Sequence, residues 1–241
     1  MKPAHKLVIV ALGFSGIIVS CALTEQKHRE NIQSYIENNL KEAISKQESK
    51  LGIKHFGLPK IIYQSLANLD FTIGVAGCYN PEIDNLCLNR VTTPNNGLAD
   101  IVGRFLGDPS IQETLDHELG HFYTDKLSES LGMGSWPNQI NAKPMEVIGL
   151  NLISEGIAEY FKKRMNNSMG VPESLNWPKE PEELRGRVYD RGFSLVRPIL
   201  ERYKREGIEY LIINPPTPAD LKDLQSYQER AMRELAKKSK K

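Results

Sequence analysis

Apolar side chains recur at intervals of three and four residues along much of this chain, which is the spacing of one face of a helix. From Thr24 to about Lys50 a polar stretch carries such a face, formed by Ile32, Tyr35, Ile36, Leu40 and Ile44. An amphipathic helix is therefore predicted there. Further helices are predicted from Ser110 to about Lys126, from about Glu146 to Arg164, from about Pro181 to Glu206 and from about Pro218 to Lys237.

The helix near Ser110 has both an entry signal and a face that should be buried. Ser110 followed by Glu113 has the spacing of a capping box, in which each side chain satisfies a free backbone N–H. The apolar face consists of Ile111, Leu115, Leu119 and Phe122. The next helix, at about Glu146 to Arg164, carries so many apolar positions that we expect it in the core.

The segment from about Ile53 to Thr93 changes character and favours extended structure. Its three runs are Lys60 to Tyr63, Phe71 to Tyr79 and Leu86 to Thr92, broken by Pro59, Asn80, Pro81 and Asn85. We expect a small sheet whose last two strands form a hairpin, with Cys78 and Cys87 facing each other across the turn. The predicted class is α+β, with a small and mostly antiparallel sheet followed by a helical half.

The composition of the chain limits the classes of binding partner that we expect. The chain has 241 residues, enough for one domain with an appended anchor, and 31 Lys plus Arg stand against 30 Asp plus Glu. This balance gives no sign of a nucleic-acid groove or of a strongly acidic partner. The short basic end KKSKK is interpreted as a solvated tail.

The first twenty residues have the layout of a secretory signal. Lys2 and Lys6 precede an apolar run from Leu7 to Ser20, which is too short to span a bilayer comfortably. The residues from Ile18 to Cys21 resemble the bacterial lipobox, which implies cleavage before Cys21 and its lipidation; an ordinary signal peptide or an uncleaved anchor is the alternative.

The lipobox resemblance also implies a place in the cell. A lipid on Cys21 would attach the protein to a membrane of the bacterial cell envelope, facing the periplasm. Ala22 stands where an aspartate would retain a lipoprotein at the inner membrane, so the outer membrane is favoured if the cell has one. The expected division is a signal peptide over residues 1–20, a tether with an amphipathic helix over 21–50, and the main domain over 51–241.

Two further cysteines, Cys78 and Cys87, are separated by eight residues. In an oxidising compartment they could form a disulfide, which would stabilise the fold by roughly 2 to 3 kcal/mol according to the loop-entropy estimate. Two reduced thiols are the alternative for a cytosolic protein. A closed zinc site is not expected here, because no further cysteine is available to complete four ligands.

The run HELGH, from His117 to His121, has the H-E-x-x-H spacing of a metal-binding motif. Residues four apart lie one turn apart on a helix, so both imidazoles can direct a nitrogen at one metal ion. Glu118 is rotated by about 100° from His117 around the helix axis, which places it beside the ion, where it can accept a proton from water. A structural pair of histidines on a helix face is the alternative interpretation.

A catalytic zinc ion needs a third protein ligand and an open position for water. Glu155 and Glu159, in the run SEGIAEY, are carboxylates in an otherwise apolar helix, where burial is costly unless they meet a cation or hydrogen-bond donors. One of them could bind the ion while the other orients a histidine. The alternative is a pair of carboxylates at the rim of the helix that face solvent.

These runs resemble those of the gluzincin metallopeptidases, a group of zincin-like enzymes that includes thermolysin and the aminopeptidase N-like enzymes. SEGIAEY is similar to the family run N-E-G-x-A-E-Y, which implies that Glu155 is the third zinc ligand and that Glu159 is secondary. YDRGFSL is similar to Y-E-K-G-F-A-L, which implies that Tyr189 stabilises the oxyanion. The resemblance covers about Phe71 to Leu211.

The resemblance implies a Zn²⁺-dependent peptidase that acts on a peptide or protein substrate, with Glu118 as general base and general acid. The chain lacks the G-A-M-E-N run with which aminopeptidases bind a free amino end, so endopeptidase action, or action on one special substrate, gains weight. Two alternatives stay open. Tyr189 could be a core aromatic residue, and the protein could be a non-catalytic envelope lipoprotein that uses the fold to bind a partner.

Overall fold

The fold comes from a computed structural model of the chain. It describes residues 34, 37, 40–53, 56–64, 77–81, 85–89, 111–136, 147–170, 175 and 182–240, without the side chains at 61–64, 77–78, 85, 87–89, 111–112 and 182–187. The chain forms two compact units, Met1–Leu40 and Lys41–Lys241. The signal peptide, Cys21 and the capping residue Ser110 lie outside the described residues. All that follows concerns the second unit.

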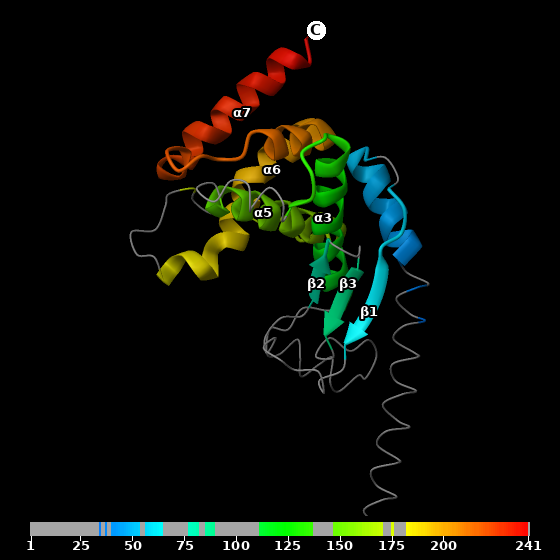
Figure 1. The fold of residues 1–241 in the computed structure, drawn as a ribbon. Helices are drawn as coiled ribbons and strands as arrows, with labels where there is room; N and C mark the ends of the chain where they lie inside the picture. Colours follow the sequence, from blue (N-terminus) through cyan, green and yellow to red (C-terminus); the bar gives the residue numbers. More distant parts are fainter. Residues whose placement is uncertain are drawn as a thin grey trace, which may run out of the picture. The chain divides into compact units, whose positions relative to one another are not determined.

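Long helices dominate this unit (Figure 1). They are α3 (Ile111–Ser130), α5 (Val147–Met165), α6 (Glu182–Ile213) and α7 (Leu224–Lys238), with a short 3₁₀ turn, η3 (Asp220–Lys222), before α7. A further helix ends at residue 51. Among the described residues, no helix has the length and apolarity needed to cross a bilayer.

The three strands are β1 (Lys60–Gln64), β2 (Gly77–Asn80) and β3 (Asn85–Asn89), in the order β1-β3-β2. As expected, β2 and β3 pair antiparallel, with Cys78 opposite Cys87 in the backbone register. However, β1 pairs parallel to β3.

The predicted α+β class with a mostly antiparallel sheet is therefore wrong. Helices of 20, 19, 32 and 15 residues dominate the described fold, while the strands have 5, 4 and 5 residues and one of their two pairings is parallel. The physical reason is that residue pattern predicts where a strand forms, whereas its direction relative to a neighbour depends on the path of the chain between them.

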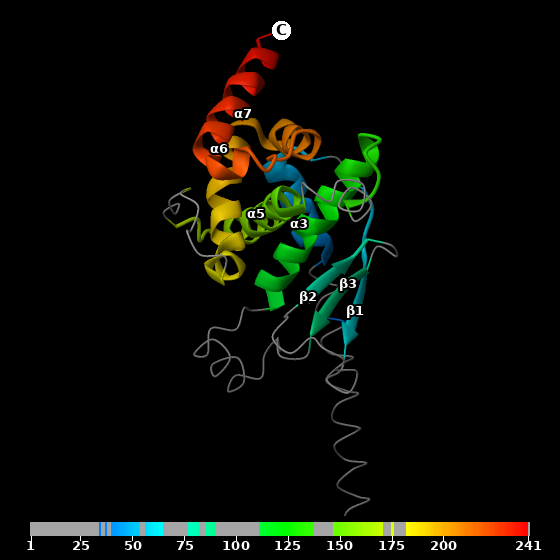
Figure 2. The same cartoon turned by 60° about the vertical axis from the view of Figure 1, so that its left-hand side comes forward.

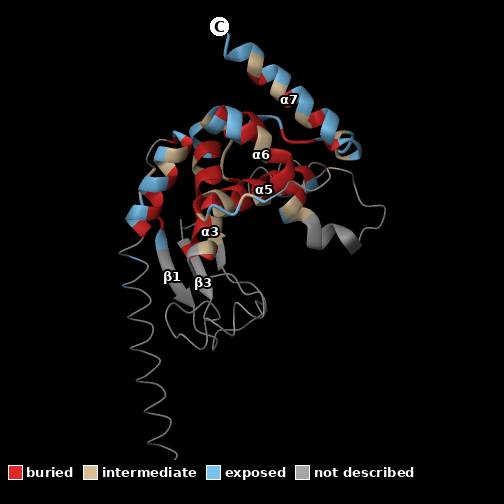
Figure 3. Cartoon of the chain, turned by 180° about the vertical axis from the view of Figure 1, so that it is seen from behind, coloured by how far each residue is buried: buried red, intermediate tan, exposed pale blue. Residues whose placement is uncertain are grey.

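Burial follows the apolar pattern of the helices (Figure 3). On α3 the expected apolar face is buried at Leu115, Leu119 and Phe122. On α5 most residues from Gly149 to Phe161 are buried, which agrees with its prediction as a core element. Figure 2 shows α3, α5 and α6 packed beside one another in the centre of this unit.

Glycines let these helices cross closely. A Cβ atom added at Gly120 of α3 would lie 2.5 Å from the Cα of Ala158 in α5. One added at Gly156 of α5 would lie 2.4 Å from the carbonyl carbon of Gly192 in α6. Real Cβ atoms do not approach backbone so closely, so any side chain at Gly120 or Gly156 would push the helices apart. These crossings set the separation of the helices that carry HELGH, SEGIAEY and YDRGFSL.

The helix predicted to end near Glu206 continues to Ile213 as α6, with a kink at Lys204 (φ 47°, ψ −123°). Positive φ is costly for a non-glycine residue and persists where packing on both sides enforces it. Here the segment after the kink buries Ile208, Leu211 and Ile212. The kink thus lets a second helical segment reach the core.

Candidate metal centre

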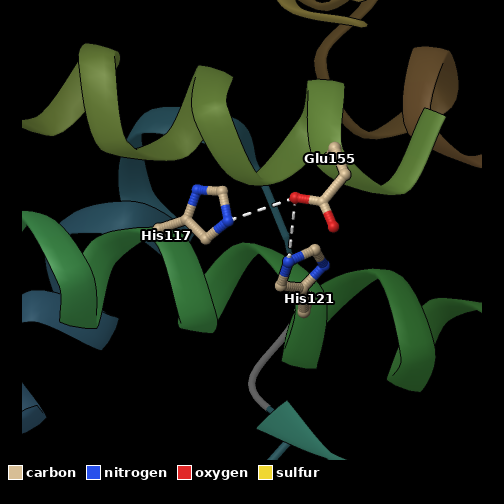
Figure 4. A group of neighbouring side chains, drawn as sticks. All are labelled: His117, His121 and Glu155. Carbon is tan, nitrogen blue, oxygen red and sulfur yellow. Dashed lines mark ion pairs between the residues drawn. The ribbon is translucent and has the colours of Figure 1, made fainter. Parts of the chain in front are cut away.

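Two helices bring three metal-binding side chains together (Figure 4). His117 and His121 lie on α3, and Glu155 lies on α5. Nε2 of His117 is 3.3 Å from Oε2 of Glu155, and Nε2 of His121 is 3.5 Å from the same oxygen. One potential ligand atom from each of the three lies within 4.8 Å of the others. The close crossing at Gly120 and Ala158 is what allows a carboxylate of α5 to reach both rings.

The second ring nitrogen of each histidine has its own neighbour. Nδ1 of His117 is 3.5 Å from Oε2 of Glu159, and Nδ1 of His121 is 2.9 Å from the hydroxyl of Ser154. A metal-binding histidine usually engages its other nitrogen in this way, which fixes the ring and its tautomer. Both rings are therefore oriented with Nε2 toward Glu155.

The charges at the centre suit a cation. Burial alone would raise the pKa of Glu155, but the His117 and His121 rings lower it well below its usual range. Burial alone would lower the pKa of His117, but the Glu155 and Glu159 carboxylates raise it to about 9. The two carboxylates thus favour a positive charge beside His117, which a bound metal ion would supply.

The three side chains fit a metal ion. Oε2 of Glu155 is buried and accepts no well-formed hydrogen bond from the described residues, although it faces two nitrogens. Such an oxygen is costly to bury unless a cation lies beside it. This group of His117, His121 and Glu155 could hold a metal ion.

Glu118 lies on α3 next to the centre and is buried, with an exposed fraction of 6%. Burial raises the pKa of its carboxyl, while the His121 and His117 rings pull it down and Glu155 pushes it up. Its charge is thus sensitive to all three residues of the centre. A carboxyl group with a raised pKa beside a metal centre is suited to take up and release a proton.

Tyr189 lies on α6 at the edge of the centre. Its ring centroid is 5.8 Å from that of His117, and 45% of the residue is exposed. The negative charge of Glu155 and partial burial raise the pKa of the phenol, so it stays protonated and can donate a hydrogen bond. The exposure disfavours the alternative in which Tyr189 is simply a core aromatic residue.

The structure does not test the two predictions about cysteines, the disulfide between Cys78 and Cys87 and the lipid on Cys21. The register places Cys78 directly opposite Cys87, a pairing compatible with a cross-strand disulfide. Their side chains lie outside what the structure describes, as does the whole of Cys21. The disulfide and the lipidation stay predictions.

Sequence reasoning missed several residues around the centre. Ser154 was not singled out, and nor were Lys162 and Lys163, which lie 2.8 Å and 3.6 Å from the Glu159 carboxylate. The glycines of HELGH and SEGIAEY were also passed over. A glycine inside a strongly helical pattern is a signal that could have been used, because it destabilises a helix unless close packing requires it.

Comparison with known proteins places the chain in no family. No family model and no solved structure matches it. In an alignment of 136 positions that covers 51% of the chain, it is 29% identical to the ATP-dependent 6-phosphofructokinase of Clostridium botulinum strain Alaska E43, and it matches that of strain Eklund 17B to the same extent. The match covers 40% of each enzyme, so the chain spans about two fifths of their length.

Proposed function

We propose that this protein is a zinc-dependent peptidase whose metal ion is held by His117, His121 and Glu155. The observation that carries the proposal is the pair of distances from the Glu155 oxygen to the two imidazoles, 3.3 and 3.5 Å. Two ligands that each lie about 2.1 Å from an ion, at a tetrahedral angle, are separated by about 3.4 Å. The two distances thus match two edges of a zinc tetrahedron, and all three ligand atoms lie within 4.8 Å of one another.

The choice of zinc rests on the donor set. Two imidazole nitrogens and one carboxylate oxygen form a common set for catalytic zinc, whereas Mg²⁺ and Ca²⁺ prefer oxygen ligands alone. Three protein ligands also leave a fourth position for water or substrate. The support of His117 by Glu159 and of His121 by Ser154 is typical of such sites.

The roles of the remaining residues follow from their positions. When bound, zinc supplies a Lewis acid and lowers the pKa of a water ligand toward about 7. Glu118 takes a proton from the attacking water and later gives it to the leaving amine. The Tyr189 hydroxyl donates a hydrogen bond to the carbonyl oxygen of the scissile peptide as negative charge develops on it.

The substitution Glu118→Gln tests this proposal. Gln keeps the shape of Glu but cannot carry the proton, so zinc should be retained while peptide cleavage falls by about a hundredfold or more. Zinc is measured by elemental analysis after dialysis, and cleavage by mass spectrometry on a peptide library. The matched control is Glu129→Gln, an exposed position on the same helix that pairs with Lys126. Cleavage by Glu118→Gln at the wild-type rate would contradict the assigned role.

The alternative function is that of a non-catalytic envelope lipoprotein that uses the zincin-like fold to bind a partner. It predicts bound zinc in the wild type with no cleavage of any library peptide. A phosphofructokinase activity, suggested only by a 29% likeness over part of those enzymes, predicts ATP-dependent phosphorylation of fructose 6-phosphate by the same sample. Both assays on one preparation separate the three possibilities.

The place of action is proposed to be the bacterial cell envelope, with the chain anchored by a lipid on Cys21. The signal layout of residues 1–20 supports this proposal. Cys21→Ser should move the protein from the detergent phase to the aqueous phase in a detergent-partition experiment. Partition of the wild type into the aqueous phase would contradict the anchor.

A further inference from the structure

A chain of contacts connects Glu159, which supports His117, to the helix turn that carries Tyr189. Nζ of Lys163 lies 3.6 Å from Oε1 of Glu159 and 3.3 Å from Oδ1 of Asp190. Asp190 follows Tyr189 in α6, and the ring of Tyr189 lies beside that of His117. The other carboxylate oxygen of Glu159 also faces His117, so both ends of this chain of contacts meet at His117.

The ammonium group of Lys163 is itself held in place. It lies over the ring of Phe193, 4.3 Å from the centroid, and this ring is buried. A cation over an aromatic face is attracted to it, and the apolar stem of the lysine packs on the same surface. Lys163 therefore presents a fixed charge between α5 and α6.

Tyr189 needs such support. With 45% of the residue exposed, packing alone restricts its side chain weakly. The early part of α6 packs on α5 through the backbones of Gly192 and Gly156. The ion pair between Lys163 and Asp190 is a further contact between the two helices, and it lies directly next to Tyr189 in the chain.

We propose that Lys163 is a positioning residue, which holds the Tyr189 turn and the Glu159 carboxylate in one arrangement around His117. The inference rests on the proposed function, because it gives Tyr189 a position to keep during catalysis. Its stability contribution should be small, since the Asp190 side chain is 45% exposed and ion pairs near the surface contribute little.

Lys162 provides a matched control. Its Nζ is 2.8 Å from the same Glu159 carboxylate, closer than that of Lys163. Among the described residues, its ion pair is with Glu159, whereas Lys163 pairs with both Glu159 and Asp190. The substitutions Lys162→Met and Lys163→Met remove the same charge beside the same carboxylate, and only the second removes the link to α6.

The first test needs no catalysis. Ring signals of Tyr189 are followed by NMR in protein with labelled tyrosine, assigned with Tyr189→Phe. We expect Lys163→Met to shift or broaden these signals, Lys162→Met to leave them close to the wild type, and Lys163→Arg to restore them. Unchanged signals in Lys163→Met, or equal shifts in both Met variants, would overturn the proposal. If Lys163→Met does not fold, Lys163→Gln takes its place.

The second test uses peptide cleavage by zinc-loaded protein. Lys163→Met should lower kcat by roughly tenfold at unchanged KM, within the range that misplacing a catalytic group by under about 1 Å produces. In a Tyr189→Phe background the same substitution should have almost no further effect. An equal loss in both backgrounds would overturn the proposal. Absence of cleavage by the wild type would instead refute the peptidase function, and the NMR comparison would still decide the role of Lys163.

Discussion

The helices α7 and α3 differ in the kinds of side chain that they bury. In α7 the buried residues are Leu224, Tyr227, Ala231 and Leu235, spaced three or four apart, and its start is capped by Asp223, which accepts a hydrogen bond from the Ser226 N–H. In α3 apolar burial is joined by buried polar side chains, at Thr114, Asp116, Glu118, Thr124, Asp125 and Ser128. A helix used only for packing has no reason to bury so many polar groups.

The buried carboxylates of α3 fall into two groups. Asp116 accepts a hydrogen bond from the side chain of Gln47, and Asp125 accepts one from the Tyr79 hydroxyl and one from the Trp136 backbone. These carboxylates attach α3 to its neighbours in the fold. Glu118 lies between them beside the histidines, where its surroundings change its pKa. In α3, therefore, some buried carboxylates attach the helix to its neighbours, while Glu118 lies beside the group that could hold a metal ion.

The largest effect should come from removing a ligand. His121→Ala removes one of the three protein ligands and leaves only His117 and Glu155. Bound zinc should therefore fall to background, and any peptide cleavage should be lost with it. Elemental analysis after dialysis measures the loss. The same substitution should leave the overall helix content unchanged, which far-UV circular dichroism checks. Full retention of zinc would show that His121 is not a ligand.

A smaller effect should follow from separating the helices. Gly156→Ala forces a Cβ atom to within 2.4 Å of the Gly192 backbone, so the free energy of unfolding should fall by about 1 to 3 kcal/mol. Zinc affinity should fall too, because α5 carries Glu155. Denaturant unfolding and zinc titration measure the two effects. The control Gln225→Ala, on the exposed side of α7, should change stability by less than about 0.5 kcal/mol.

Loss of the support for His121 should be milder still. Ser154→Ala removes the hydroxyl 2.9 Å from Nδ1 and frees the ring to turn, so zinc affinity should fall by about tenfold. Competition with a chelator of known affinity measures the change. Ser130→Ala, at the end of α3, removes a hydroxyl that bonds to the Leu127 carbonyl and should leave zinc affinity as it is. Equal affinities for Ser154→Ala and the wild type would contradict this role.

The smallest effect should come from the packing region. The Tyr227 hydroxyl of α7 donates a hydrogen bond of 2.6 Å to the Asn214 carbonyl. Tyr227→Phe should lower the free energy of unfolding by about 1 kcal/mol, the usual net value of such a bond, and leave zinc binding unchanged. Denaturant unfolding measures the first and chelator competition the second. A change in zinc affinity would show that α7 is coupled to the centre.

Much of the helical framework could be predicted from residue pattern. The segment expected at about Glu146 to Arg164 forms α5 from Val147 to Met165. The last helix, α7, ends one residue beyond the expected Lys237, but it begins at Leu224, six residues after the expected Pro218, with η3 in between. Apolar spacing is a local property, so it transfers directly from sequence to helix. The kink at Lys204 and the continuation of α6 beyond the expected end at Glu206 could not be predicted, because a strained residue is maintained only by packing on both sides of it.

The sequence by itself determined that His117 and His121 share one helix face, since four-residue spacing dictates it. It marked Glu155 and Glu159 through the anomaly of carboxylates in an apolar helix, and the family resemblance chose Glu155 between them. Only the tertiary structure decided how near that carboxylate comes, which partners turn the rings toward it, and that β1 runs parallel to β3. Periodicity acts within a few residues of the chain, whereas these features depend on backbones that approach one another at Gly120 and Gly156 from distant parts of it.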